Sequence, residues 1–189
     1  MSLANQNITP KIHPQKFALW LGIVSIIMLF AALTSAFIVR RSAGNWEQFR
    51  LPSIFWFSTL TIMISSATMH WAVTSFKKYK YNTYRIAITT TFVLGCLFIF
   101  LQYRGWLALQ NIGIYINGNP SGSFLYVISM AHATHVLGGI VVLLFAMILS
   151  FTRSYNPNRI KNISMAATYW HFVDVLWVYL FIFFQLNLS

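Results

Sequence analysis

Hydrophobic residues are gathered into five long runs, and polar segments separate them. The runs cover approximately residues 17–39, 53–76, 85–106, 123–151 and 164–188. Each run is at least as long as the roughly 20 residues that an α-helix needs to cross the hydrocarbon core of a bilayer. The pattern therefore predicts an all-α fold, a polytopic membrane helix bundle with five transmembrane helices. These helices form a single domain over residues 17–189, after a polar N-terminal tail over residues 1–16.

The composition favours a membrane protein and indicates its orientation. The chain is 58% hydrophobic and 8% charged, with a net charge of +11. In a soluble protein this charge would suggest nucleic-acid binding, but here the basic residues lie between the apolar runs, where they determine topology. The N-terminal tail and the second and fourth loops carry nine of the thirteen Lys and Arg residues. The positive-inside rule therefore predicts that the N-terminus is inside and the C-terminus outside.

Two of the runs carry a stripe of small or hydroxylated residues that suits contact between helices. In the first run the stripe is Gly22, Ser25, Leu29, Ala32 and Ala36, and in the second it is Ser58, Thr61, Ser65 and Thr68. Small residues let helices approach closely in lipid, where hydrophobicity does not favour helix contact over lipid contact. We expect both stripes to face other helices of the bundle.

His132 and His135 are three residues apart in the fourth run, and this spacing places both on one face of a helix. Such a pair could ligate a metal, or supply one of the two axial ligands of a haem. However, the chain has a single cysteine, Cys96, and no matching second histidine pair. We therefore interpret His132 and His135 as intramembrane histidines that hydrogen-bond across helices. We predict no catalytic residue and no metal ligand in this chain.

Asp174 is one of two acidic residues, and it lies in the fifth run. An ionised aspartate near the middle of a membrane helix costs about 3 kcal/mol, so it persists where a partner inside the bundle compensates for it. His171, three residues earlier on the same helical face, is the nearest candidate. We predict a structural polar pair between His171 and Asp174. A proton relay through these two residues is the alternative.

Basic residues on the predicted inner side could also bind lipid. Lys16, Arg153, Arg159 and Lys161 flank the first, fourth and fifth runs. Each basic residue near an anionic membrane surface contributes about 1 kcal/mol to binding. We expect these four to contact anionic phospholipid headgroups. The alternative is that they only fix the topology.

Several segments together resemble one protein family. Residues 169–177 read YWHFVDVLW, residues 131–139 read AHATHVLGG, and Leu51-Pro52 and Ser65-Ser66 lie earlier in the chain. These segments resemble features of subunit III of haem–copper oxidases. Residues 169–177 resemble the signature of the family's final helix, and residues 131–139 resemble its H-x-x-H-V-x-x-G helix. Leu51-Pro52 and Ser65-Ser66 resemble its earlier leucine-proline and serine features. That family comprises the third subunits of cytochrome c and quinol oxidases. The resemblance extends from about His13 to the end of the chain.

The resemblance implies an accessory subunit of a respiratory oxidase in a bacterial plasma membrane. The complex would reduce dioxygen to water and translocate protons. This subunit would bind no haem or copper, which belong to partner subunits, and would support the stability and proton uptake of the catalytic subunit I. The chain departs from the family in two ways. It has five runs where members commonly have seven spans, and it has Ile26 where many relatives have glutamate.

Two other functions remain open at this point. One is a subunit-III-like partner of a nitric oxide reductase. The other is an independent haem-binding membrane cytochrome that would use His70, His132, His135 or His171 as ligands.

Overall fold

The computed structural model describes residues 14–152 and 160–188, which form five helices. Their bounds are α1 Pro14–Ser42, α2 Ile54–Lys77, α3 Tyr81–Asn111, α4 Pro120–Thr152 and α5 Ile160–Leu188. Five helices were predicted, and almost all of each predicted run lies inside one of them. The third loop is shorter than the sequence suggested, because α3 continues to Asn111 and α4 already begins at Pro120.

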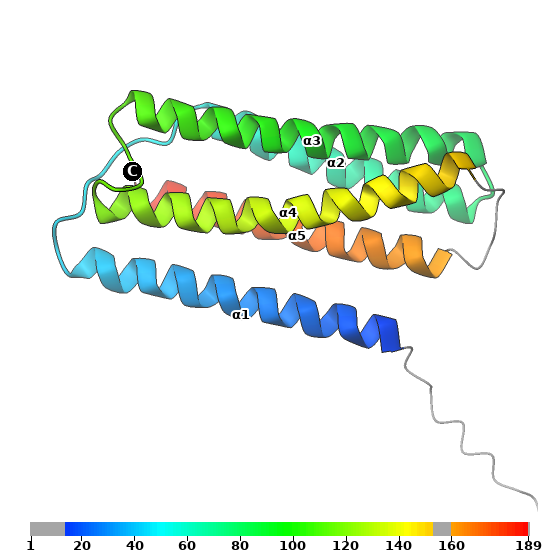
Figure 1. The fold of residues 1–189 in the computed structure, drawn as a ribbon, viewed down its shortest axis with the longest axis horizontal. Coiled ribbons are helices and arrows are strands. Elements are labelled where there is room, and N and C mark those ends of the chain that lie inside the picture. The colour runs from blue at the N-terminus through cyan, green and yellow to red at the C-terminus, as the bar shows by residue number, and fades with distance from the viewer. Residues whose placement is uncertain (1–13, 153–159, 189) are drawn as a thin grey trace, which may run out of the picture.

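The helices run up and down along one long axis (Figure 1). Helices α2, α3, α4 and α5 form a closed ring, in which α2 contacts α3, α3 contacts α4, α4 contacts α5 and α5 contacts α2. Helix α1 lies outside this ring against α4 and α5, and within the described residues it contacts neither α2 nor α3. Helix α5 thus packs against α4 on one side and against α2 on the other. Helix α1 covers the junction of α4 and α5, whereas no described helix covers the junction of α2 and α5.

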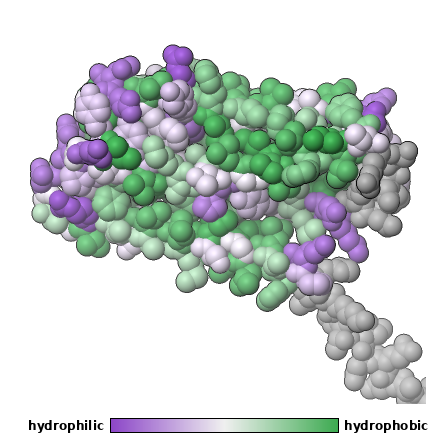
Figure 2. Space-filling view, in the orientation of Figure 1, coloured by the Kyte–Doolittle hydropathy of each residue, from purple (hydrophilic) through white to green (hydrophobic). Residues whose placement is uncertain are grey.

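Four of the five helices, α1, α3, α4 and α5, are long and apolar enough to cross a membrane. Figure 2 shows hydrophilic residues mainly near the two ends of the molecule and a mostly hydrophobic surface between them. Helix α2 is not among these four, and it is rich in serine and threonine and contains His70. The chain is therefore an integral membrane protein whose second helix carries an unusual load of polar side chains.

The hydroxyl groups of α2 are used inside the bundle. Ser65 donates a hydrogen bond to the Thr91 carbonyl of α3 at 3.4 Å, and the hydroxyls of Thr68 and Thr91 are 2.9 Å apart. Ser58 accepts a hydrogen bond from Gln102 of α3 at 3.4 Å. Three members of the predicted stripe thus face α3, as expected.

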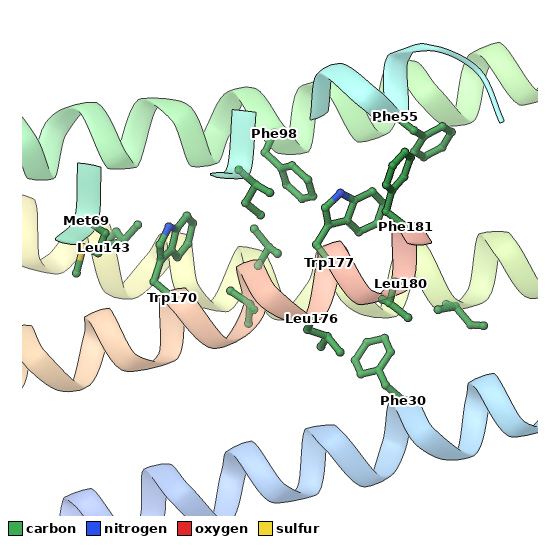
Figure 3. Close-up of a cluster of buried hydrophobic side chains, with 14 of the residues drawn as sticks. Phe30, Phe55, Met69, Phe98, Leu143, Trp170, Leu176, Trp177, Leu180 and Phe181 are labelled. Carbon is green, nitrogen blue, oxygen red and sulfur yellow. The ribbon is translucent and has the colours of Figure 1, made fainter. Parts of the chain in front are cut away.

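Two tryptophans of α5 hold the ring together (Figure 3). Trp170 donates a hydrogen bond to Ser65 of α2 at 3.1 Å, and its ring packs closely against Gly95 of α3 and Gly139 of α4. Trp177, seven residues further on, donates to Thr59 of α2 at 3.0 Å and packs its ring against Phe98 of α3 and His132 of α4. Each indole therefore touches elements from three other helices at a different depth of the bundle.

The packing face of α1 differs from the prediction. The buried residues of this helix are Ile23, Phe30, Thr34 and Phe37. The predicted stripe, Gly22, Ser25, Leu29, Ala32 and Ala36, is exposed on the outer side. Larger side chains face the bundle because they fill the space between α1 and the pair α4 and α5, as Phe30 does in Figure 3.

The C-terminal ends of α1 and α5 are tied together. Arg41 donates a hydrogen bond to the side-chain oxygen of Asn187 at 2.8 Å. In the following loop, the Phe49 amide donates to the Leu188 carbonyl at 2.9 Å. These bonds fix α1 to the bundle at one end, and in Figure 1 the helix diverges from α4 toward its N-terminal end.

Candidate functional site

A groove between α2 and α5 brings together the polar residues near the middle of the bundle. It has a volume of about 400 Å³. Helix α2 lines it with Met63, Ser66, Ala67 and His70, and α5 lines it with His171, Asp174, Val175 and Val178. Both sets follow the spacing i, i+3, i+4, i+7, which places each set in one stripe along its helix. The groove therefore has two parallel walls, and each wall carries polar groups.

The two walls are joined by one short hydrogen bond. The Ser66 hydroxyl and Nδ1 of His171 are 2.6 Å apart. The ring of His70 lies beside that of His171, with the ring centres 6.4 Å apart. Serine, two imidazoles and a carboxylate thus meet where α2 crosses α5.

Asp174 lines this groove, yet neither of its carboxylate oxygens has a hydrogen-bond partner among the described residues. The Ser66 hydroxyl is near enough to interact with the carboxylate, but its hydrogen bond is to His171. Asp174 is only 3% exposed. A carboxylate that is shielded from water and lacks a donor is costly, so this group is expected to bind something that the chain itself does not supply.

The predicted pair between His171 and Asp174 is not formed as a direct hydrogen bond. Nδ1 of His171 is engaged with Ser66 of α2, and both oxygens of Asp174 lack a partner in the described part of the chain. The physical reason is that both side chains project from α5 toward α2, so that the imidazole meets a hydroxyl across the groove before it meets the carboxylate one turn away on its own helix.

His132 lies elsewhere, in an aromatic enclosure. It is fully buried, and its ring centre is 5.1 Å from that of Trp177 and 6.0 Å from that of Phe98. Neither ring nitrogen has a hydrogen-bond partner within residues 14–152 and 160–188. In this part of the chain His132 makes no hydrogen bond to another helix, because apolar rings surround its imidazole.

His135 also bonds within its own helix rather than across helices. Its Nδ1 is 2.7 Å from the Ala131 carbonyl. The cross-helix hydrogen bond at this position comes instead from the Tyr169 hydroxyl, which donates to the His135 backbone carbonyl at 3.0 Å. The side chain of His135 thus has a local partner, and the contact between α4 and α5 uses its main chain.

The described histidines do not converge on a common point. His70 and His171 lie in the groove between α2 and α5, while His132 and His135 lie near α1. Among the described residues, no group of three or more His, Cys, Asp or Glu side chains is placed to hold a metal ion. The geometry therefore gives no support to a redox centre built from these residues.

A second cleft lies between the N-terminal ends of α1 and α5. It has a volume of about 730 Å³, and both Lys16 and Lys161 line it. Leu19, Trp20 and Met165 supply an apolar wall. Two of the four predicted lipid contacts thus lie at one cleft, whereas Arg153 and Arg159 fall outside the described residues.

The sequence did not single out Ser66 as a site residue or His70 as a member of this site. Ser66 lies next to the predicted stripe of α2 but points to a different neighbour, α5 instead of α3. A detectable signal was the spacing Met63, Ser66, Ala67, His70, since it repeats the spacing of His171, Asp174, Val175 and Val178. The sequence does not show that these two stripes face one another.

Comparison with known proteins identifies the family. A family model described as cytochrome c oxidase subunit III matches residues 9–187. Cytochrome c oxidase subunit 3 of Bacillus subtilis is 27% identical over 168 residues, which are 86% of this chain and 81% of that protein. The probable cytochrome c oxidase subunit 3 of Nocardia farcinica is 27% identical over 173 residues, covering 86% of this chain and 82% of the relative.

A quinol oxidase subunit is also similar. The probable quinol oxidase subunit 3 of Staphylococcus saprophyticus is 24% identical over 172 residues, which are 88% of this chain and 85% of the relative. The family match covers the whole of the described bundle, including the groove between α2 and α5. This chain therefore belongs to the cytochrome c oxidase subunit III family.

Proposed function

We propose that this chain is the accessory, non-redox subunit III of a respiratory haem–copper oxidase in a bacterial plasma membrane. In this role it binds the catalytic subunit I and supports its stability and proton uptake, while the complex reduces dioxygen to water and translocates protons. Haem and copper belong to the partner subunits. The observation that carries the proposal is the family match over residues 9–187.

The arrangement of the described side chains supports a non-redox role. The four described histidines occupy two separate places, and none of them shares a metal-holding group with other described ligands. Relatives named for cytochrome c oxidase and for quinol oxidase both match over more than four fifths of this chain. We expect other subunits to determine the electron donor, because similar third subunits carry the names of both kinds of oxidase.

The proposed topology has five spans, with the N-terminus inside and the C-terminus outside. Helix α2 has 24 residues and is about 36 Å long at 1.5 Å per residue, which exceeds the roughly 30 Å hydrocarbon core. Its polar side chains are tolerable in a membrane because Ser58, Ser65 and Thr59 are buried against other helices. The nine inner-side basic residues support the orientation.

Purification through a tag on this chain tests the proposal. A haem–copper catalytic subunit is expected to co-purify in equal amount, identified by mass spectrometry. After separation from the complex, this chain is expected to show no Soret absorption band. Isolation of the chain without an oxidase subunit would refute the proposal. A Soret band lost on replacing His132 or His135 would establish a cytochrome instead.

We also propose that Lys16 and Lys161 bind the headgroup of an anionic phospholipid in the cleft between α1 and α5. A neighbouring cleft of about 600 Å³ continues from the first, because both are lined by Leu19 and Met165. The second cleft is bounded by Gly138 and Val142 of α4. The charged mouth suits a phosphate, and the apolar continuation suits an acyl chain.

Replacing both lysines, as Lys16→Gln with Lys161→Gln, tests this lipid site. Two basic residues at about 1 kcal/mol each imply roughly 30-fold weaker binding of the anionic lipid. Mass spectrometry of the purified complex measures the co-purified phospholipid. The matched control is Lys77→Gln with Lys78→Gln, which removes the same charge from the same side but outside the cleft. An equal loss of lipid in both variants would contradict the site.

A further inference from the structure

We propose that the groove between α2 and α5 receives a transmembrane helix of the catalytic subunit, which donates a hydrogen bond to Asp174. This inference rests on the proposed function and adds to it the face by which this chain binds its partner. Three features of the groove lead to it: the shape of its walls, the unpartnered carboxylate, and its depth in the bundle.

The shape of the groove suits a helix. Its two walls are parallel stripes with the same i, i+3, i+4, i+7 spacing. Ser66 and Ala67 are small residues in the wall of α2, and small residues allow the backbones of membrane helices to approach closely. Met63 and Val175 are exposed apolar residues at the same groove, and they supply a contact surface for a neighbouring helix.

The bundle already contains one example of this packing. Helix α1 covers the outer side of α4 and α5, where Phe30 and Phe37 are buried. The side formed by α2 and α5 has no covering helix among the described residues. The uncovered side is nevertheless the one with the buried, unpartnered carboxylate.

The carboxylate of Asp174 determines the chemistry of the occupant. It accepts hydrogen bonds, so the partner must present a donor such as a hydroxyl, an amide, an indole or a basic group. His171 does not serve as that donor, because neither carboxylate oxygen of Asp174 has a hydrogen-bond partner among the described residues. A donor on a partner helix would complete a polar cluster that this chain leaves incomplete.

The depth of the groove favours a protein partner over a lipid. Asp174 is at position 15 of the 29 residues of α5, close to the midpoint of the helix. Lipid headgroups lie at the membrane surface, and acyl chains carry no donor, so neither can satisfy a carboxylate at this depth. A partner helix can, because its side chains carry donors at every depth.

Site-specific photo-crosslinking in the assembled membrane complex tests this proposal. A benzophenone amino acid replaces Val175 in the groove, and in a matched variant it replaces Val93 on the outer face of α3. Both positions are exposed, at 67% for Val175 and 56% for Val93, so neither substitution disturbs the core. A crosslink to the catalytic subunit is expected from Val175, at a yield at least about tenfold above that from Val93.

Other outcomes overturn the inference in recognisable ways. Crosslinks from Val175 to a second copy of this chain, or to lipid alone, would refute it, as would a higher yield of catalytic subunit from Val93. If no catalytic subunit co-purifies with the tagged chain, the proposed function is refuted, and the proposed groove contact is refuted with it. Co-purification of the catalytic subunit together with crosslinks from Val93 would leave the function standing and reject this face.

A pair of substitutions at Asp174 tests the hydrogen bond itself. Asp174→Asn keeps an acceptor oxygen, whereas Asp174→Val removes it at similar size. We expect the catalytic subunit to be lost on detergent washing about tenfold faster with valine than with the native aspartate, and asparagine to restore most of the retention. Circular dichroism of each purified subunit verifies that the bundle is folded. Equal retention by folded valine and asparagine variants would contradict the donor.

Discussion

Replacing Trp177 with alanine is expected to lower the free energy of unfolding of the subunit by about 3–5 kcal/mol. The indole is fully buried, and its ring packs against Phe55, Phe98 and His132 from three other helices. Removing it leaves a cavity that these rings cannot fill, and it also leaves Thr59 without its donor. Unfolding in mixed micelles, driven by increasing dodecyl sulfate and followed by circular dichroism, measures the change.

Two further variants define the cause of this loss. Trp177→Phe keeps most of the ring but removes the hydrogen bond to Thr59, so a smaller loss of about 1 kcal/mol is expected. Trp71→Ala is the matched control, because Trp71 is 49% exposed and its removal leaves no enclosed cavity. If Trp71→Ala destabilised the subunit as much as Trp177→Ala does, the cavity explanation would be wrong.

Adding a methyl group at two contacts with Trp170, through Gly95→Ala with Gly139→Ala, is expected to destabilise the bundle by about 2–6 kcal/mol. A Cβ atom at Gly95 would lie 2.8 Å from the indole, and one at Gly139 would lie 2.9 Å from it. Both contacts are with the six-membered ring of one buried indole, so either this ring or a helix has to shift. The yield of folded subunit and its unfolding in mixed micelles both report the effect.

The chain offers a matched control for these two glycines. Gly138 is the neighbour of Gly139 in α4, and a Cβ atom there would meet its nearest atom, the Tyr169 hydroxyl oxygen, at 3.9 Å. At Gly22 in α1 a Cβ atom would meet no atom within 4 Å. Gly22→Ala with Gly138→Ala should therefore be neutral or slightly stabilising, since alanine favours helix more than glycine does. Destabilisation equal to that of the first pair would exclude close packing as the cause.

The number and order of the helices could be predicted because each apolar run is long and is bounded by polar residues. The inward face of α1 could not be predicted. In a membrane, apolar side chains suit both lipid and the bundle interior, so the sequence pattern does not distinguish Phe30 from Leu29. The small residues Gly22 and Ala32 pointed to the wrong face for the same reason, since small size permits close contact but does not require it.

The candidate site was predicted in part. Asp174 stood out because an intramembrane acid needs a partner, and His171 lies one turn away. The partner of His171, however, is Ser66, which is 105 residues earlier in the chain. Only the pairing of α2 with α5 brings these two residues together, and this pairing depends on how Trp170 and Trp177 pack against α2. No local pattern in the sequence contains that information.

The position of α1 outside the ring has a consequence for how the chain is made. Its packing partners are the last two helices of the chain, and the bond between Arg41 and Asn187 joins residues 146 positions apart. At about 5–20 residues per second, roughly 7–30 s of synthesis separate these two residues. Until α4 and α5 have been made, the buried face of α1, with Phe30 and Phe37, has neither helix to cover it. Helix α1 is thus made before the two helices that cover it, and during synthesis lipid or an insertion factor must cover its inward face.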